Sequence, residues 1–186
     1  GIAAAVMAVS ATAVGMRSYS ANAADLELDN YAKLLQYSLY FYDANMCGDK
    51  VGGTSAFSWR DNCHTGDVAL GGFHDAGDAI KCGQTAGFTA STLGWAYYEY
   101  KDQFQKTGTT AHFKVISDEF NEFFKRCTTL SGNTVTSFIY EVGDDGPDHA
   151  KWFAPEAMWD HGSSETYSTT DGASDIAAQY AASLAQ

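Results

Sequence analysis

Proline and basic residues are scarce in this chain of 186 residues. It has only 2 prolines and is 45% hydrophobic, so we do not expect disorder. Its 11 Lys and Arg residues are outnumbered by 23 Asp and Glu residues, which gives a formal net charge of -12. Because an acidic chain repels phosphate backbones, we expect no nucleic-acid partner. A neutral polymer such as a glucan would not be repelled.

Aromatic residues, in contrast, make up 14% of the chain, with 11 Tyr, 11 Phe and 4 Trp. Many aromatic side chains simply pack in cores, but aromatic faces are also the surfaces on which sugar rings stack. The length suffices for one domain with a sizeable core.

Long apolar runs are absent after residue 24, so no later segment is expected to cross a membrane. Near the start, Ile2 to Val14 is a small-residue apolar run of about the length of a signal-peptide core, and Ala21-Asn22-Ala23 matches a cleavage site. We therefore expect residues 1–24 to be a secretory signal peptide and the protein to be secreted to the extracellular space. An ordinary N-terminal helix is the alternative.

Hydrophobic periodicity predicts four helices, at about residues 30–44, 85–104, 110–126 and 176–184. The third is the clearest, with an apolar stripe of Phe113, Ile116, Phe120, Phe123, Phe124 and Cys127. Residues 134–142, rich in Val, Thr, Phe, Ile and Tyr, are β-like. Residues 45–83 have no regular period, and so long an irregular connection is uncommon in a compact domain unless it has a function.

Asp75 and Asp78 lie three residues apart at the end of the sequence GGFHDAGD, with Gly77 between them to allow a positive φ. Two close carboxylates can hold one water, one accepting its proton while the other orients it. An inverting glycosidase needs such a base about 6.5–9.5 Å from an acid. On spacing alone, a capped or calcium-contacting turn is the commoner explanation.

Several motifs, taken together, resemble glycoside hydrolase family 9, the inverting cellulases. They follow one another in the family's order from about residue 29 to the end: YSLYFYDA at 37–44, FSWR at 57–60, CH at 63–64, GGFHDAGD at 71–78, TLGW at 92–95, YEVGD at 140–144, DHAKW at 148–152 and SDIA at 174–177.

The resemblance implies that residues 25–186 are the N-terminal part of a truncated catalytic domain, an all-α partial (α/α)6 barrel with long irregular loops. It implies an endo-β-1,4-glucanase that hydrolyses cellulose or β-glucan with inversion. Asp78 would be the catalytic base and Asp75 would help to hold the attacking water. His149 and Trp152 would line glucose subsites, and Trp59 lies in the substrate-side loop. The expected partners are glucan chains, with no membrane contact after signal removal, and the protein is expected to be a monomer.

Two departures from the family pattern matter. The family's general acid, a Glu, and its calcium-site segment would both lie beyond Gln186, so we expect the 186 residues alone to be inactive. Ala79 also stands where many members have a His beside the base. The alternative is therefore a non-catalytic carbohydrate-binding or structural protein derived from the same fold.

A second group of residues combines soft and borderline metal ligands: Cys47, Cys63, His64 and His74. Such a set suits a closed, tetrahedral structural zinc site, and some family members carry zinc at matching positions. Asp67 is an alternative to His74 as the fourth ligand. A Cys47–Cys63 disulfide is the alternative to zinc, because a secreted chain can oxidise its thiols.

The remaining polar features receive ordinary structural interpretations. Cys82 and Cys127 could form a second disulfide or remain separate thiols. We expect His112 on the outer face of a helix, His161 in a polar turn, and residues 143–148 in a solvated acidic loop.

Overall fold

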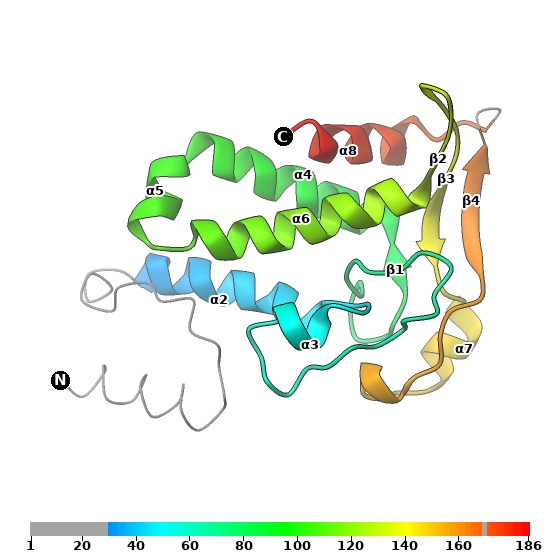
Figure 1. Ribbon diagram of the computed structural model, residues 1–186, viewed down its shortest axis with the longest axis horizontal. Helices are drawn as coiled ribbons and strands as arrows, with labels where there is room; N and C mark the ends of the chain where they lie inside the picture. Colours follow the sequence, from blue (N-terminus) through cyan, green and yellow to red (C-terminus); the bar gives the residue numbers. More distant parts are fainter. Residues whose placement is uncertain (1–29, 169–170) are drawn as a thin grey trace.

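The computed structural model describes residues 30–168 and 171–186, and the expected signal peptide lies outside these ranges (Figure 1). The helices are α2 Asn30–Asn45, α3 Val51–Thr54, α4 Gly83–Glu99, α5 Lys101–Lys106, α6 Thr110–Cys127, α7 Asp145–Ala150 and α8 Ser174–Leu184, with a 3-10 helix at Pro155–Ala157. The strands are β1 Lys81–Cys82, β2 Thr128–Ser131, β3 Thr134–Val142 and β4 Ser164–Ser168.

The predicted helices are confirmed, with one division. The expected helix at 85–104 is split into α4 and α5 at Tyr100, where the backbone leaves helical geometry (φ -120°, ψ 30°). In α6, every residue of the predicted apolar stripe is buried. Apolar residues at this spacing form one broad buried face of the helix. This face of α6 contacts three other helices, α2, α4 and α8. Figure 1 shows α6 between α2 and α4.

The core lies around α6 and is largely aromatic. Phe120 packs against Phe73 with ring centroids 4.2 Å apart, and Phe124 stacks on Tyr180 of α8 at the same distance. Phe73 belongs to the irregular segment between α2 and β1, so this segment contributes directly to the core. Among the described helices, none combines the length and apolar character needed to span a membrane.

The expectation of an all-α fold is wrong in one respect, because the chain also forms a four-stranded antiparallel sheet. The predicted β-like segment, residues 134–142, is its central strand β3. β2 and β3 form a hairpin, and Gly132 supplies the positive φ (61°) of the two-residue turn. β1 pairs with the end of β3, Lys81 opposite Val142, and β4 lies along the other side. The sheet thus joins the segment after Asp78 to the segment before α7.

The irregular segment from Met46 to Ile80 is held by separate backbone hydrogen bonds. Cys47 N donates to Gly72 O and His74 N donates to Asn45 O, both at 2.9 Å. A further bridge links Gly48 to Cys63. These contacts fold the segment back on the end of α2. They bring Cys47 and Cys63 close to His74, the residue before the aspartate turn at 75–78.

Candidate active site

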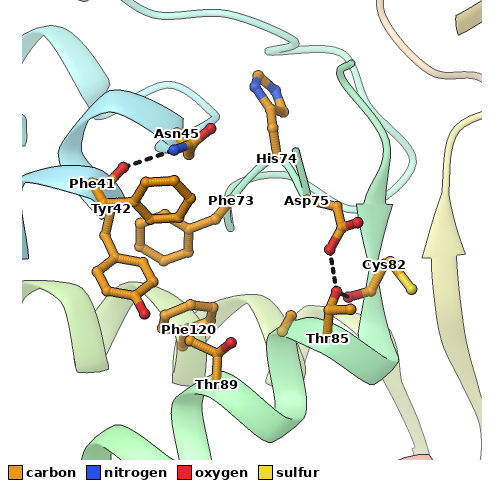
Figure 2. A pocket seen from close by; sticks show the side chains of 11 residues that line it. Phe41, Tyr42, Asn45, Phe73, His74, Asp75, Cys82, Thr85, Thr89 and Phe120 are labelled. Carbon is orange, nitrogen blue, oxygen red and sulfur yellow. Dashed lines mark hydrogen bonds between the residues drawn. The ribbon is translucent and has the colours of Figure 1, made fainter. Parts of the chain in front are cut away.

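The turn that carries the two aspartates is closed by its own backbone. Asp75 N donates to Ile80 O at 2.8 Å, and Ile80 N donates to Asp78 Oδ1 at 3.1 Å. The Thr85 hydroxyl, in the first turn of α4, donates to Asp75 Oδ1 (Figure 2). One oxygen of each carboxylate is therefore held by a hydrogen bond from a residue close in the sequence, Ile80 for Asp78 and Thr85 for Asp75.

The other oxygen of Asp78 contacts a residue from a distant segment. His149 Nε2, on α7, lies 2.7 Å from Asp78 Oδ2. Asp144 precedes α7 and caps it, because its side chain accepts a hydrogen bond from Gly146 N. Ala79, the residue after Asp78, is buried (1% exposed) and offers this aspartate no polar group, so the imidazole in contact with Asp78 comes from His149.

A groove of about 490 Å³ runs past Asp78. Trp59 and Trp152 line it together with Asp78, and Trp59 stacks on Phe57 with ring centroids 4.9 Å apart. A second hollow of about 350 Å³ contains Asp78, His149 and Trp152. The structure thus brings together four of the five predicted catalytic and substrate-binding residues.

Asp75 does not line the groove that contains Asp78. It lines a separate pocket of about 240 Å³ between α2, α4 and α6, whose aromatic wall is shown in Figure 2: Phe41, Tyr42, Phe73 and Phe120. Asn45 and His74 line both this pocket and the groove, so the two hollows adjoin.

The role expected for Gly77 needs correction. Its φ is not positive; the positive values in this motif occur at Gly71 (87°) and Gly72 (83°). A Cβ on Gly77 would overlap the Trp152 indole, coming within 2.6 Å of its Cζ3. With Trp152 in this position, a side chain on residue 77 would meet the indole ring.

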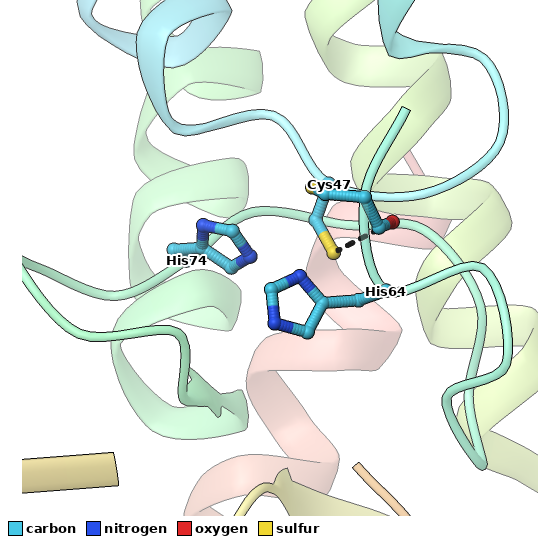
Figure 3. Close-up of side chains that lie close together, drawn as sticks. Cys47, His64 and His74 are labelled. Carbon is cyan, nitrogen blue, oxygen red and sulfur yellow. Dashed lines mark hydrogen bonds between the residues drawn. The ribbon is translucent and has the colours of Figure 1, made fainter. Parts of the chain in front are cut away.

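The four predicted metal ligands lie together. One donor atom from each of Cys47, Cys63, His64 and His74 lies within 4.8 Å of all the others, and all four residues are buried (Figure 3). Both ring nitrogens of His64 and Nε2 of His74 are buried without hydrogen-bond partners. His64 has a φ of 49°, a strained value for a residue other than glycine. Two sulfurs and two imidazoles of this kind fit tetrahedral zinc.

The state of the thiols agrees with this fit. All four cysteines of the chain are free, so neither suggested disulfide is formed. The hydrogen bond between the two thiols lowers the pKa of Cys63 and raises that of Cys47, so the thiolate that binds metal is favoured at Cys63. Asp67, the alternative fourth ligand, lies instead 2.7 Å from Lys81.

That contact belongs to a buried ionic group that the sequence analysis did not identify. Asp67 also accepts from His161 N at 2.5 Å, and His161 Nε2 lies 3.0 Å from Asp148 Oδ1. Burial raises the pKa of Asp67, but His161 and the Lys81 ammonium outweigh it and hold this pKa at about 2. Burial lowers the pKa of His161, but its two aspartate partners raise it overall.

Three structural expectations are therefore wrong. His161, expected in a polar turn, is buried, and Asp148 is buried although residues 144–147 of the expected acidic loop are exposed. His112 is also buried, and it bonds to Asp43 and Gln36 rather than facing outward. Burying a polar side chain has a desolvation cost that hydrogen-bonding partners must offset. The partners found here are 13 to 94 residues away in the sequence, so local patterns do not indicate them.

Arg60 is a further residue that the sequence analysis left without a role. Its guanidinium donates to Glu156 Oε1 at 2.6 Å, to Met46 O at 2.9 Å and to Ala44 O. It thereby joins the end of α2 to the 3-10 helix that follows Trp152. The only local signal was its place next to Trp59.

Comparisons with known proteins agree with this geometry. The profile of Glycosyl hydrolase family 9 matches residues 31–186. Endoglucanase B of Cellulomonas fimi is 32% identical over 163 residues, which cover 84% of this chain and 15% of that protein. Endoglucanase 25 of Arabidopsis thaliana is 31% identical, with 84% and 28% covered.

Solved structures give the same result. The catalytic domain of CelT from Clostridium thermocellum matches with a TM-score of 0.80 and 40% identity, covering 84% of this chain and 38% of that one. The endoglucanase CelQ from the same organism, complexed with cellotetraose, matches with a TM-score of 0.69 and 30% identity, covering 84% and 25%. The chain spans well under half the length of each of these proteins.

Proposed function

The chain belongs to glycosyl hydrolase family 9, and on this basis we propose that it is the N-terminal part of the catalytic domain of a secreted endo-β-1,4-glucanase. Its helices would form part of an (α/α)6 barrel, and its substrate would be cellulose or a soluble β-glucan. The observation that carries the proposal is the position of Asp78, which lies in a groove lined by Trp59 and Trp152.

In the proposed reaction, Asp78 accepts a proton from water while the water oxygen attacks the anomeric carbon. The bond from this carbon to the leaving oxygen breaks on the opposite face, which inverts the configuration. The leaving oxygen takes a proton from a general acid, a role that we assign to no residue of this chain. Asp75 lines the adjoining pocket rather than the groove, so it would orient the water from that side, with one of its oxygens fixed by the Thr85 hydroxyl.

The groove suits a neutral sugar chain. Trp59 and Trp152 are 56% and 80% exposed, so their faces are open for stacking against pyranose rings. His149 can donate a hydrogen bond to a sugar hydroxyl next to Asp78, since its side chain is 58% exposed. The acidic net charge of the chain does not oppose an uncharged ligand. The enzyme would act as a monomer on glucan chains.

We also propose that Cys47, Cys63, His64 and His74 hold a structural zinc ion. The unpartnered imidazole nitrogens and the favoured thiolate support this assignment. A bound zinc would cross-link the irregular segment and would take no part in the reaction. His74 directly precedes Asp75, so the cross-link would restrain the aspartate turn.

The test is Asp78→Asn in the complete catalytic domain, with Asp145→Asn as a control at an exposed carboxylate nearby. Release of reducing sugar from soluble β-glucan should be abolished by the first change and retained with the second. Binding of the glucan in affinity electrophoresis should be little affected by either. Near-normal hydrolysis by Asp78→Asn would show that another group is the base.

A further inference from the structure

The ionic group behind the groove forms a continuous chain of contacts. We name it the buried ionic chain, and its members in order are Lys81, Asp67, His161 and Asp148. We propose that this chain is a positioning device that holds His149 against Asp78. The inference deepens the proposed function and rests on it, because it takes Asp78 to be the base.

All four side chains of the buried ionic chain are removed from solvent, and its longest side-chain link joins His161 Nδ1 to Asp67 Oδ2 at 3.5 Å. Lys81 Nζ lies 2.7 Å from Asp67 Oδ2, and both side chains are fully buried. His161 connects the two aspartates, with its backbone N donating to Asp67 Oδ1 and its Nε2 lying 3.0 Å from Asp148 Oδ1. Lys81 Nζ is further fixed by the carbonyl oxygens of Ala69 and Gly71, at 2.6 and 3.1 Å.

The two ends of the buried ionic chain lie next to the two residues that it would position. Lys81 begins β1 three residues after Asp78, and Asp148 directly precedes His149 in α7. Asp148 Oδ2 accepts from Asp144 N at 2.9 Å, which fixes the carboxylate to the start of α7. The buried ionic chain therefore connects the same two segments as the contact between His149 and Asp78. It does so through buried side chains, whereas the contact itself is partly exposed to solvent.

The contact in the groove needs such support. His149 is more than half exposed, and an ion pair in contact with water contributes little to its own geometry. Burying several charges is costly, and apolar residues of similar volume are often as stable. A connected set of directional contacts fixes an orientation that apolar packing would leave free. This difference favours a positioning role over a purely stabilising one.

The test observes His149 directly in the 186-residue chain, by long-range ¹H–¹⁵N correlation of its imidazole. Asp78→Asn gives the reference resonance for a His149 without its carboxylate partner. His161→Leu removes the side-chain contact with Asp148 and keeps the backbone hydrogen bond to Asp67, whereas His161→Gln keeps an amide donor for Asp148. Asp145→Asn, an exposed carboxylate on the same helix, is the control.

A positioning role predicts that His161→Leu moves the His149 Nε2 resonance more than half of the way to the Asp78→Asn reference. His161→Gln should restore most of this shift, and Asp145→Asn should cause none. A His149 resonance that stays in place in His161→Leu, while the melting temperature falls, would overturn the proposal and leave a structural role only. If His161→Leu does not fold, Asp148→Asn is judged by the same criterion.

This readout requires no hydrolysis, so it is separable from the proposed function. If the complete domain is inactive on glucan but His149 shifts as expected, the enzyme assignment fails and the positioning stands. If the domain is active but His149 does not shift, only the positioning inference fails.

Discussion

The indole of Trp152 lies against Gly77, so closely that a methyl group on this glycine would overlap the ring. The two residues come from segments 75 positions apart, yet they form one wall of the groove beside Asp78. The shape of the aspartate turn and the position of the aromatic platform therefore depend on each other.

Gly77→Ala should displace Trp152 and weaken glucan binding. If the indole loses a stacking contact worth about 0.5–1.5 kcal/mol, the Kd for a cello-oligosaccharide should rise up to about tenfold. Isothermal titration of the complete domain measures this change. Gly53→Ala is the matched control, because a Cβ there meets nothing within 4 Å. Unchanged binding in Gly77→Ala would mean that Trp152 does not contact the sugar.

Zinc should be present in stoichiometric amount in the purified chain. Cys63→Ser should lose the metal, because it removes the favoured thiolate of the set. Cys82→Ser should keep it, because this thiol lies outside the cluster. Elemental analysis gives the metal content, and a chelator should lower the melting temperature of the unmodified chain. A Cys47–Cys63 disulfide found by mass spectrometry of the native protein would contradict the zinc proposal.

Arg60→Met should destabilise the fold strongly. The substitution removes a buried guanidinium and leaves the carbonyl oxygens of Ala44 and Met46 without its N–H donors, whereas Glu156 Oε1 still accepts from Asp61 N. Glu156 is partly exposed to solvent, so the cost comes mainly from the orphaned carbonyl oxygens, at about 1–3 kcal/mol for each buried acceptor left unpaired. Urea denaturation measures the loss, with Lys125→Met as the control at an exposed pair. A loss as small as that of the control would show that Arg60 is not needed to hold the segment.

Stability should depend on pH through Glu119. Its carboxylate accepts from Gly72 N at 2.9 Å, and burial raises its pKa above the ordinary value of 4.5. The folded state therefore binds this proton more tightly than the unfolded state. The resulting stabilisation is fully present below pH 4.5 and is lost as the pH rises through the folded pKa.

Glu119→Gln keeps an oxygen for Gly72 and removes the charge, so its free energy of unfolding should vary less with pH in that range. Urea denaturation at a series of pH values from 4.5 to 7 compares the variant with the unmodified chain. Glu122→Gln, on the exposed side of α6, should not flatten the profile. Parallel profiles for Glu119→Gln and the unmodified chain would remove Glu119 as the cause.

Local patterns predicted the parts of this molecule that local physics determines. The stripe from Phe113 to Cys127 follows the helical period, and residues 134–142 have β-branched and aromatic content, so α6 and β3 were both predicted closely. The motifs also led to the correct family. They placed Asp78 beside His149 and Trp152, although the catalytic roles of these residues stay predictions.

The contacts between distant segments could not be predicted in this way. His161 meets Asp67 across 94 positions, and neither residue has a neighbour that indicates the other. Gly77 was interpreted through its backbone freedom, because the sequence does not show that an indole approaches it. β1 has only two residues and is defined by its partner rather than by its composition.

The segment from Met46 to Ile80 is joined to the molecule by single hydrogen bonds and by side chains of a few chemical kinds, without a continuous ladder. A helix unfolds only when many equivalent hydrogen bonds break together. In this segment, alkylation of Cys47 and Cys63 would remove the proposed zinc cross-link and leave only separate hydrogen bonds and a few core residues such as Phe73 to hold it. We expect proteases to cleave here first when thiols are alkylated, at temperatures where α4 and α6 are still intact.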